Sequence, residues 1–158
     1  MLGFCIANNM RLRVKQLKEL ERIILFLEGE IRVRHAILGE AFLFASKKCG
    51  QPFNEWLMFL SDSLSDVNCV SDFNTVWTGS LAILRDKSKL NKSDLSIVEN
   101  IGQTLGYLDI RAMEQGLLLE RENIKDVVKT SLCELPNRVR ISIILGILGG
   151  VLVILILI

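Results

Sequence analysis

Apolar and polar residues alternate along the chain in the pattern of amphipathic helices. Between Leu17 and Ile31, leucine and isoleucine recur at steps of three and four residues, which places them on one helix face. No segment shows the period of two that is typical of a half-buried strand. We therefore expect an all-α bundle of about six helices. The first predicted helix ends at about Arg34, and the second covers Leu38–Lys48. The third begins at Pro52 and the fourth after Ser71 or Asp72. The fifth runs from Ser93 to Gly106, and the sixth from Ile110 to about Leu135.

The predicted helix boundaries rest on residues that cap or break helices. Ser93 is expected to cap the fifth helix and Asp109 the sixth, because short polar side chains accept hydrogen bonds from free N–H groups at helix starts. Gly106 is expected to end the fifth helix in the left-handed conformation. Pro136 is expected to break or kink the sixth. The polar segment from Ser61 to Asn74 is interpreted as a loop.

The last stretch, residues 141–158, differs from the bundle because it holds no charged residue. As a helix it would be about 27 Å long, close to the roughly 30 Å hydrocarbon core of a bilayer. We interpret it as a C-terminal transmembrane helix, since a buried core helix is rarely apolar over this length. Arg138 and Arg140 precede it and place the upstream residues in the cytoplasm by the positive-inside rule. Gly146 and Gly150 would let another helix approach closely, although this spacing is common in apolar runs that contain glycine.

Composition and charge exclude several classes of function. A net charge of +1 argues against nucleic acid as the main partner, because phosphate binding needs a basic surface. His35 is the only histidine and the four cysteines follow no metal-binding spacing, so we expect no metal, no cofactor and no catalytic triad. Glu28 and Glu30 would point about 200° apart on a helix and cannot act together on a substrate. These features favour a membrane-attached interaction module over an enzyme.

The first long helix is the candidate docking element. It carries more apolar residues than one buried stripe requires, and its polar side is charged in both signs. Mixed charges suit a docking surface, where they select the partner more than they add affinity. An ordinary solvated face is the alternative. Arg121, Lys125 and Lys129 of the sixth helix are expected to form a solvated row. The candidate docking residues are Glu21, Glu28, Glu30, Arg32 and Arg34.

Several short motifs occur in a characteristic order along the chain. The segment from Ile101 to Asp109 reads IGQTLGYLD, a long charged helix follows it, and Leu145 to Gly150 form an apolar L-G-x-x-x-G tail. In this order and spacing the sequence resembles the stage III sporulation protein AB family over essentially its whole length. The hairpin motif of that family corresponds to Gly102, Leu105, Gly106 and Asp109, which any tight helical hairpin would also require.

This resemblance implies a non-enzymatic membrane platform component of the secretion-like channel between mother cell and forespore, needed for endospore formation. The implied fold is similar to the cytoplasmic domains of type II secretion F and pilus platform proteins. The implied partners are a cytoplasmic ATPase similar to stage III sporulation protein AA and other membrane components of the complex, with a homo-oligomer as a further option. The implied location is the mother-cell side, in the outer forespore membrane, with the bundle in the cytoplasm.

The resemblance also implies a division of the chain into three parts. Residues 1–9 would be the remnant of an N-terminal membrane helix, because family members begin with a complete one. Residues 10–137 would form the cytoplasmic bundle and residues 138–158 the C-terminal transmembrane helix. The family's usual Thr-Pro is replaced by Ala36-Ile37, so the second helix is expected to start differently. The alternative function is a tail-anchored helical regulator or scaffold that binds a soluble partner and has no channel role.

Overall fold

The computed structural model describes the backbone of residues 2–34, 37–65, 72–107 and 109–157. Within these ranges the side chains of residues 2–7, 33–34, 135–143, 145 and 157 are not described. The described residues form α-helices and no strand, which confirms the predicted all-α class. The helices are α1 (Leu2–Arg34), α2 (Leu38–Ser46), α3 (Phe53–Ser65), α4 (Phe73–Lys87), α5 (Lys92–Leu105) and α6 (Ile110–Leu157).

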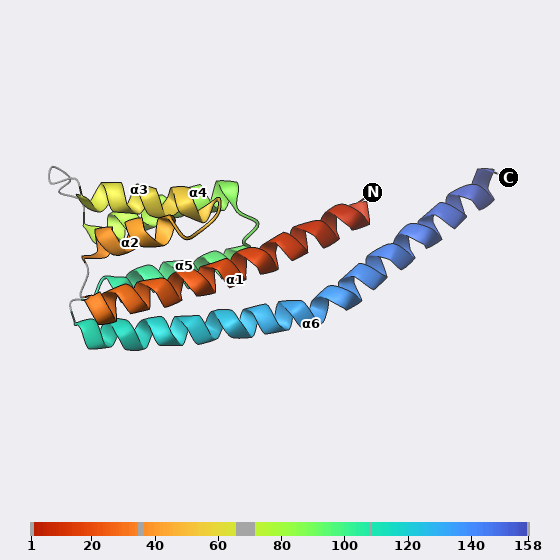
Figure 1. Cartoon of the computed structure of the whole chain (residues 1–158). Helices are drawn as coiled ribbons and strands as arrows, with labels where there is room; N and C mark the ends of the chain where they lie inside the picture. The colour runs from red at the N-terminus through yellow and green to blue at the C-terminus, as the bar shows by residue number, and fades with distance from the viewer. Residues whose placement is uncertain (1, 35–36, 66–71, 108, 158) are drawn as a thin grey trace.

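The helices form a bundle from which two of them extend (Figure 1). The short helices α2, α3 and α4 lie on one side, and α1, α5 and α6 lie on the other. The most extensive helix contacts are those of α1 with α6 and of α2 with α3. Both α1 and α6 run beyond the bundle at the same end, where both termini lie. Two helices of the bundle, α1 and α6, therefore continue beyond it in the same direction.

The core is built from the apolar stripes that the sequence predicts. Helices α1, α3, α5 and α6 each turn one such stripe inward, and burying each large aliphatic side chain contributes about 1.5–3 kcal/mol. The α1 stripe is confirmed in full, because each of its five predicted members is at most 4% exposed. The buried members of these stripes include Leu17, Leu20, Ile24, Leu27, Ile31, Phe53, Trp56, Leu57, Leu60, Val98, Ile101, Leu105, Met113, Leu117, Ile124 and Val128.

An aromatic cluster joins the two sides of the bundle. The rings of Trp56 and Trp77 meet edge to face with their centroids 5.2 Å apart, and Phe42 lies 6.0 Å from Trp77. Both indole N–H groups are satisfied, since Trp56 Nε1 donates to Ser80 Oγ at 2.8 Å and Trp77 Nε1 donates to the Val98 carbonyl at 3.1 Å. Buried indoles are stable only with such partners. The cluster therefore fixes α3, α4 and α5 relative to one another.

Two glycines allow neighbouring helices to approach closely. A Cβ on Gly102 would lie 2.1 Å from Trp77 Nε1, and a Cβ on Gly116 would lie 2.4 Å from Thr104 Cγ2. These separations are far below van der Waals contact, so no larger residue fits at either position without movement of the helices. Gly102 thus sets the packing of α5 on α4, and Gly116 sets that of α6 on α5.

The predicted end of the fifth helix at Gly106 is confirmed, whereas its predicted cap and the predicted conformation of Gly106 are wrong. The cap is Asn91, whose side chain accepts from the Asp94 N–H while the Asp94 carboxylate accepts from the Asn91 N–H, so Ser93 lies inside the helix. Gly106 has φ −77° and ψ −6°, a right-handed conformation open to any residue, so the expected left-handed turn is absent there. Asp109 fulfils its predicted role at the start of α6, because its carboxylate accepts from the Arg111 N–H at 3.2 Å.

Two predicted breaks lie inside helices. Helix α3 continues to Ser65, so it includes the first five residues of the predicted loop, and residues 66–71 of that loop lie outside the described residues. Helix α6 runs without a break from Ile110 to Leu157 and passes through Pro136. Proline removes one helical hydrogen bond, and a long helix with extensive packing on one side of that position can tolerate the loss.

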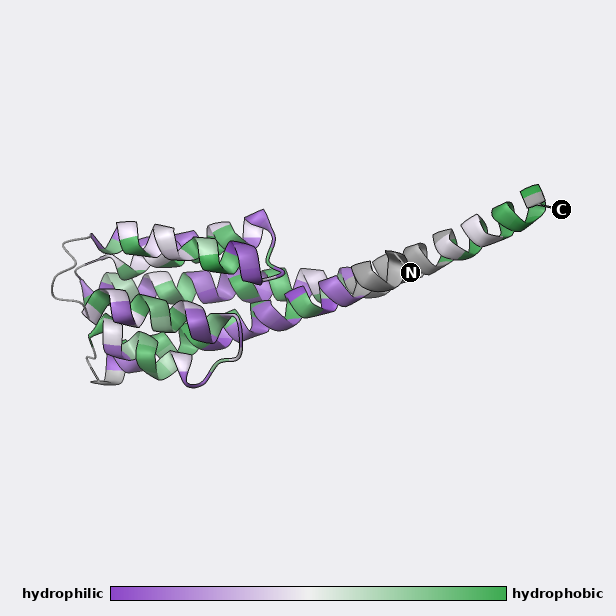
Figure 2. Ribbon diagram, turned by 90° about the horizontal axis from the view of Figure 1, so that it is seen from above, coloured by the Kyte–Doolittle hydropathy of each residue, from purple (hydrophilic) through white to green (hydrophobic). Residues whose placement is uncertain are grey.

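The extension of α6 contains the predicted membrane segment. The last described turns of α6 are coloured as hydrophobic, whereas the helices of the bundle carry both hydrophobic and hydrophilic colours (Figure 2). Within the part of the chain that the structure describes, no helix is long and apolar enough to cross a membrane. The side chains of Arg138 and Arg140, and several within residues 141–158, lie outside the described residues. A Cβ on Gly146 or Gly150 would meet no atom within 4 Å.

Candidate functional site

Charged side chains lie along the seam where α1 and α6 pack against each other. Arg13, in the first half of α1, reaches across this seam to Ser131, and Glu28, near the end of α1, pairs across it with Arg121. Between them, side chains of both helices line a surface groove, which we call the α1–α6 groove. Its lining residues are Lys18, Glu21, Arg22, Leu25, Arg121 and Lys125.

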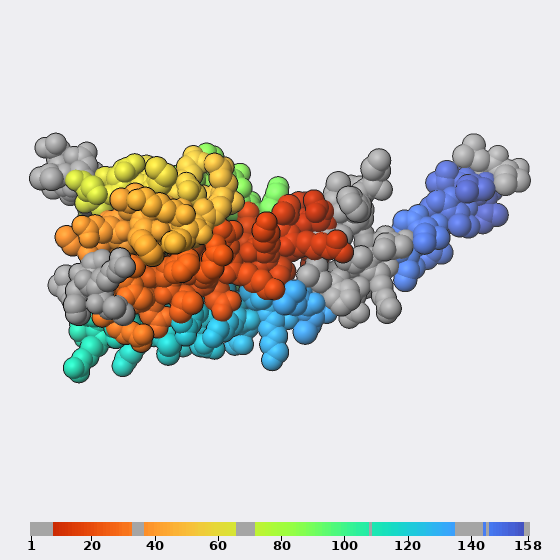
Figure 3. All heavy atoms as spheres, in the orientation of Figure 1, coloured from red at the N-terminus to blue at the C-terminus, as the bar shows by residue number. Residues whose placement is uncertain are grey.

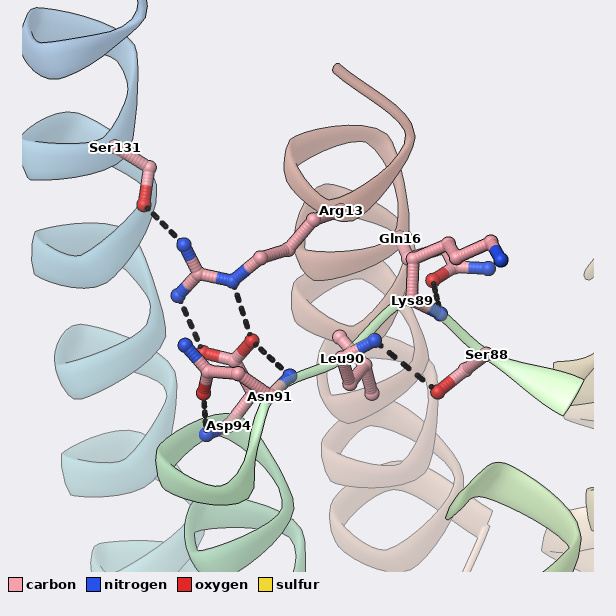
Figure 4. A network of polar contacts seen from close by, with 8 residues as sticks. All are labelled: Arg13, Gln16, Ser88, Lys89, Leu90, Asn91, Asp94 and Ser131. Carbon is pink, nitrogen blue, oxygen red and sulfur yellow. Dashed lines mark hydrogen bonds and ion pairs between the residues drawn. The ribbon is translucent and has the colours of Figure 1, made fainter. Parts of the chain in front are cut away.

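Arg13 is the centre of a polar network that joins three helices (Figure 4). Its Nε and Nη2 donate to the two carboxylate oxygens of Asp94 at 2.6 and 2.8 Å, and its Nη1 donates to Ser131 Oγ at 3.3 Å. The hydrogen bond to Asp94 is the main reason that the pKa of Arg13 lies above its usual value. Asp94 is 1% exposed and also completes the capping box with Asn91. The network therefore fastens the start of α5 to both α1 and α6.

A second ion pair joins α1 to α6 near the other end of the bundle. Arg121 Nη1 donates to Glu28 Oε2 at 2.9 Å, and their side chains are only 18% and 12% exposed. The expectation that Glu28 lies on a solvated face is therefore wrong, as is the expectation that Arg121 belongs to a solvated row. Local spacing on one helix does not reveal such a contact, because the two residues are 93 positions apart in the chain. A carboxylate held in this way is unsuited to be the first contact of a partner.

The other predicted docking residues of α1 have different surroundings. Arg32 is exposed, whereas Glu21 and Glu30 are half-buried. Glu21 lines the α1–α6 groove. The side chain of Arg34 lies outside the described residues. The predicted docking set is thus divided between an interhelix ion pair, a groove and an exposed helix face.

The middle of α1 holds the turn between α2 and α3. Arg22 Nη2 donates to the Lys48 carbonyl at 2.7 Å, and the Glu19 carboxylate accepts from the Gly50 N–H at 2.6 Å. Burial raises the pKa of the Cys49 thiol in this turn to about 11. The thiol is therefore protonated at neutral pH and is a poor nucleophile. This arrangement is structural, and it orders a turn on the surface of α1.

The predicted hairpin motif is also structural. Gly102 and Leu105 are buried, Gly106 is exposed, and Asp109 caps α6 as described above. Among the described residues there is no group of three or more histidine, cysteine, aspartate or glutamate side chains that could hold a metal ion.

The Arg13–Asp94 network was missed in the sequence. One half of it has a visible signal, because Asn91 and Asp94 have the spacing of a capping box. The contact of Arg13 with Asp94 has no signal in the sequence. Arg13 belongs to the basic run Arg11, Arg13, Lys15 and Lys18, which is equally typical of a membrane border. Burial of its partner on another helix becomes apparent only in the folded chain.

Comparison with known proteins decides the family. The profile described as stage III sporulation protein AB matches residues 1–158. The chain belongs to the stage III sporulation protein AB family. It is 28% identical to the stage III sporulation protein AB of Bacillus subtilis (strain 168) over 156 residues, which are 98% of this chain and 90% of that protein. This result confirms the resemblance drawn from the IGQTLGYLD segment and the apolar tail.

A solved structure shares the fold. The structure of a stage III sporulation protein AB superposes on this chain with a TM-score of 0.70 at 24% sequence identity. The match covers 77% of this chain and 94% of that one. Both relatives are named for sporulation and neither name states an enzymatic activity. The chain is therefore assigned a role in sporulation.

Proposed function

We propose that this chain is a non-enzymatic membrane platform component of the secretion-like channel between mother cell and forespore. Membership of the family supports the sporulation role. The structural observation that carries the proposal is that α1 and α6 leave the bundle at the same end (Figure 1). Two long helices that leave together are suited to join a folded domain to one membrane. The ion pairs along their seam would then couple the membrane segments to the bundle.

The proposed membrane attachment rests on the sequence of the extension. Residues 138–158 would form the C-terminal transmembrane helix, with Arg138 and Arg140 on its cytoplasmic side. Residues 1–9 would be the end of a preceding membrane helix, and residues 10–137 would form the cytoplasmic bundle. Gly146 and Gly150 lie in open space in the isolated chain, which suits contact with a neighbouring membrane helix.

The proposed partner of the bundle is the cytoplasmic ATPase similar to stage III sporulation protein AA. The exposed charges of α1 support this docking role, because exposed charges select partners. Those described are cationic: Arg11, Lys15, Lys18, Arg22 and Arg32. Arg32 is the best-placed candidate contact, since it is exposed and lies outside the α1–α6 groove. Glu28 is not a suitable contact, for the reason given above.

Reporter fusions test the topology. A reporter fused near Asn91, at the start of α5, is expected to give a cytoplasmic signal, and one fused after Ile158 the opposite signal. A signal from outside the cytoplasm at Asn91 would refute the proposed orientation.

Binding of the ATPase to the purified full chain tests the docking. Arg32→Glu is expected to weaken binding several-fold. Arg85→Glu is the matched control, because Arg85 is an exposed residue of α4, and this change should not affect binding.

A further inference from the structure

Two surfaces of this chain have opposite charge and similar length. The first is the α1–α6 groove, whose lining holds four cationic side chains and one carboxylate around the half-exposed Leu25. The second is a stripe on α3, which we call the α3 stripe. Its members follow the i, i+3, i+4, i+7 spacing of one helix face. They are Glu55, Met58, Phe59 and Asp62.

The α3 stripe is an exposed apolar pair between two acidic residues. Met58 is 45% exposed and Phe59 is 44% exposed, which is unusual for large apolar side chains next to each other on a small domain. Asp62 is exposed, and Glu55 is half-exposed and paired with Lys87. The stripe therefore presents apolar area with a negative rim.

The groove presents apolar area with a positive rim. Lys18 is exposed at one end, and Leu25 is 51% exposed at the other. The remaining cations contact carboxylates outside the groove lining: Arg121 contacts Glu28, Lys125 contacts Glu122, and Arg22 lies 4.0 Å from Glu19. Lys18 is therefore the cation on which attraction of an acidic partner depends most. The α1 side of the groove, from Lys18 to Leu25, and the α3 stripe each extend for about 10 Å.

The positions of the two surfaces allow copies of the chain to stack side by side. Helices α3 and α6 lie on opposite edges of the bundle and both run along its long axis (Figure 1). The atoms of α1 and α6 meet along one face, and those of α3 form the upper edge (Figure 3). A contact of the α3 stripe with the groove of a second copy would align the long axes of the two copies. In the parallel arrangement both copies keep their α1 and α6 extensions pointing the same way.

We propose that the α1–α6 groove binds the α3 stripe of a second copy of this chain. Charge complementarity, equal length and the shared long axis support this occupant. The contact is heterologous, because each copy offers a different surface, so it can continue into a ring or an open array. Copies held in one membrane by parallel extensions would meet in the required orientation. The inference concerns contact between copies and does not depend on docking of the ATPase.

The first test maps the contact by photo-cross-linking. The full chain, purified in non-ionic detergent, carries p-benzoylphenylalanine in place of Phe59, which keeps an aromatic ring at that position. Irradiation is expected to give a dimer whose cross-link, located by mass spectrometry, falls in residues 18–25 or 121–125. No dimer, or a cross-link that falls elsewhere, overturns the proposal. A cross-link in sporulating cells to a different protein, with none between copies, also overturns it.

The second test exchanges the charges. Lys18→Glu alone and Asp62→Lys alone are each expected to lower the dimer yield by about tenfold, because each brings like charges together. A mixture of the two variants should recover the yield, since the altered stripe then fits the altered groove and the unaltered surfaces fit each other. Lys89→Glu is the control, because Lys89 is exposed in the α4–α5 connection and belongs to neither surface. Circular dichroism verifies that each variant is folded.

The mixing result distinguishes this contact from a symmetric one. In a twofold contact of groove on groove, Asp62→Lys would have no effect and the mixture would not recover the dimer. Either result, or an unchanged yield for Lys18→Glu, contradicts the proposal. Raising the salt concentration should also lower the yield for the unaltered chain, because the attracting charges are exposed. The test contains no ATPase, so its failure leaves the proposed docking role standing.

Discussion

The two seams that hold this bundle together are specified in different ways. The seam from α4 through α5 to α6 depends on shape, because Gly102 accommodates Trp77 and Gly116 accommodates Thr104. The seam from α1 to α6 combines buried apolar stripes with charge contacts, through the Arg13–Asp94 network and the Glu28–Arg121 pair. Shape complementarity is lost when one atom is added, whereas a charge contact is lost when a partner is removed. Charge contacts thus add to the apolar packing of α1 and α6, and α6 also belongs to the seam that depends on shape.

The largest effect is expected from filling the space at Gly102. Gly102→Val would place side-chain atoms inside the Trp77 ring, so we expect a loss of about 4 kcal/mol or failure to fold. Chemical unfolding of the full chain in detergent, followed by circular dichroism, measures it. Gly29→Ala is the control, since a Cβ there meets no atom within 4 Å and alanine favours a helix. Equal stability of Gly102→Val and the parent would show that α4 and α5 do not pack as described.

A smaller loss is expected from opening the Arg13 network. Asp94→Ala leaves the part-buried guanidinium of Arg13 without its carboxylate and removes half of the capping box, so we expect about 3 kcal/mol. Asp126→Ala, on the exposed face of α6, is the matched control and should change stability by less than about 0.5 kcal/mol. If both variants unfold at the same denaturant concentration, the network does not fasten α5 to α1.

The Glu28–Arg121 pair is expected to be weaker than the Arg13 network. A double-mutant cycle with Glu28→Gln and Arg121→Gln should give a coupling of about 1–2 kcal/mol, since both side chains are mostly buried. The same cycle on the exposed pair of Lys87 and Glu55 should give about 0.5 kcal/mol or less. Equal couplings would mean that burial does not distinguish the two pairs.

The smallest effect is expected at Gly106. Its backbone is right-handed, and an added Cβ would meet its nearest atom at 3.4 Å. Gly106→Ala should therefore change the free energy of unfolding by less than about 1 kcal/mol, although the glycine closes a recognisable hairpin motif. A loss as large as that of Gly102→Val would indicate a left-handed turn at this position.

Much of the fold could be predicted from the sequence, because helix faces and caps are local properties. The stripe from Leu17 to Ile31 and the cap at Asp109 are examples. The error at the cap of α5 was local, since Asn91 and Asp94 have the spacing of a capping box. Gly106 has the residue type of a left-handed turn, yet its backbone is right-handed. Contacts between distant segments have no comparable signal in the sequence.

The candidate site was less predictable than the fold for the same reason. The charges on α1 were visible, but their partners lie on other helices and have no spacing signal in the sequence. Glu28 therefore looked like a surface charge until its contact with Arg121 was apparent. The reason for a glycine at position 102 is likewise visible only in the folded chain, where Trp77 occupies the space that a side chain would need.

The proposed function requires this chain to hold the ATPase at a membrane. Liposome flotation tests it directly: the full chain is reconstituted into liposomes, the purified ATPase is added, and the liposomes are floated through a density gradient. We expect the ATPase to float with liposomes that carry the chain, to remain at the bottom with empty liposomes, and to float less with the Arg32→Glu variant. A chain that stays at the bottom of the gradient, or an ATPase that never floats with it, would contradict the account.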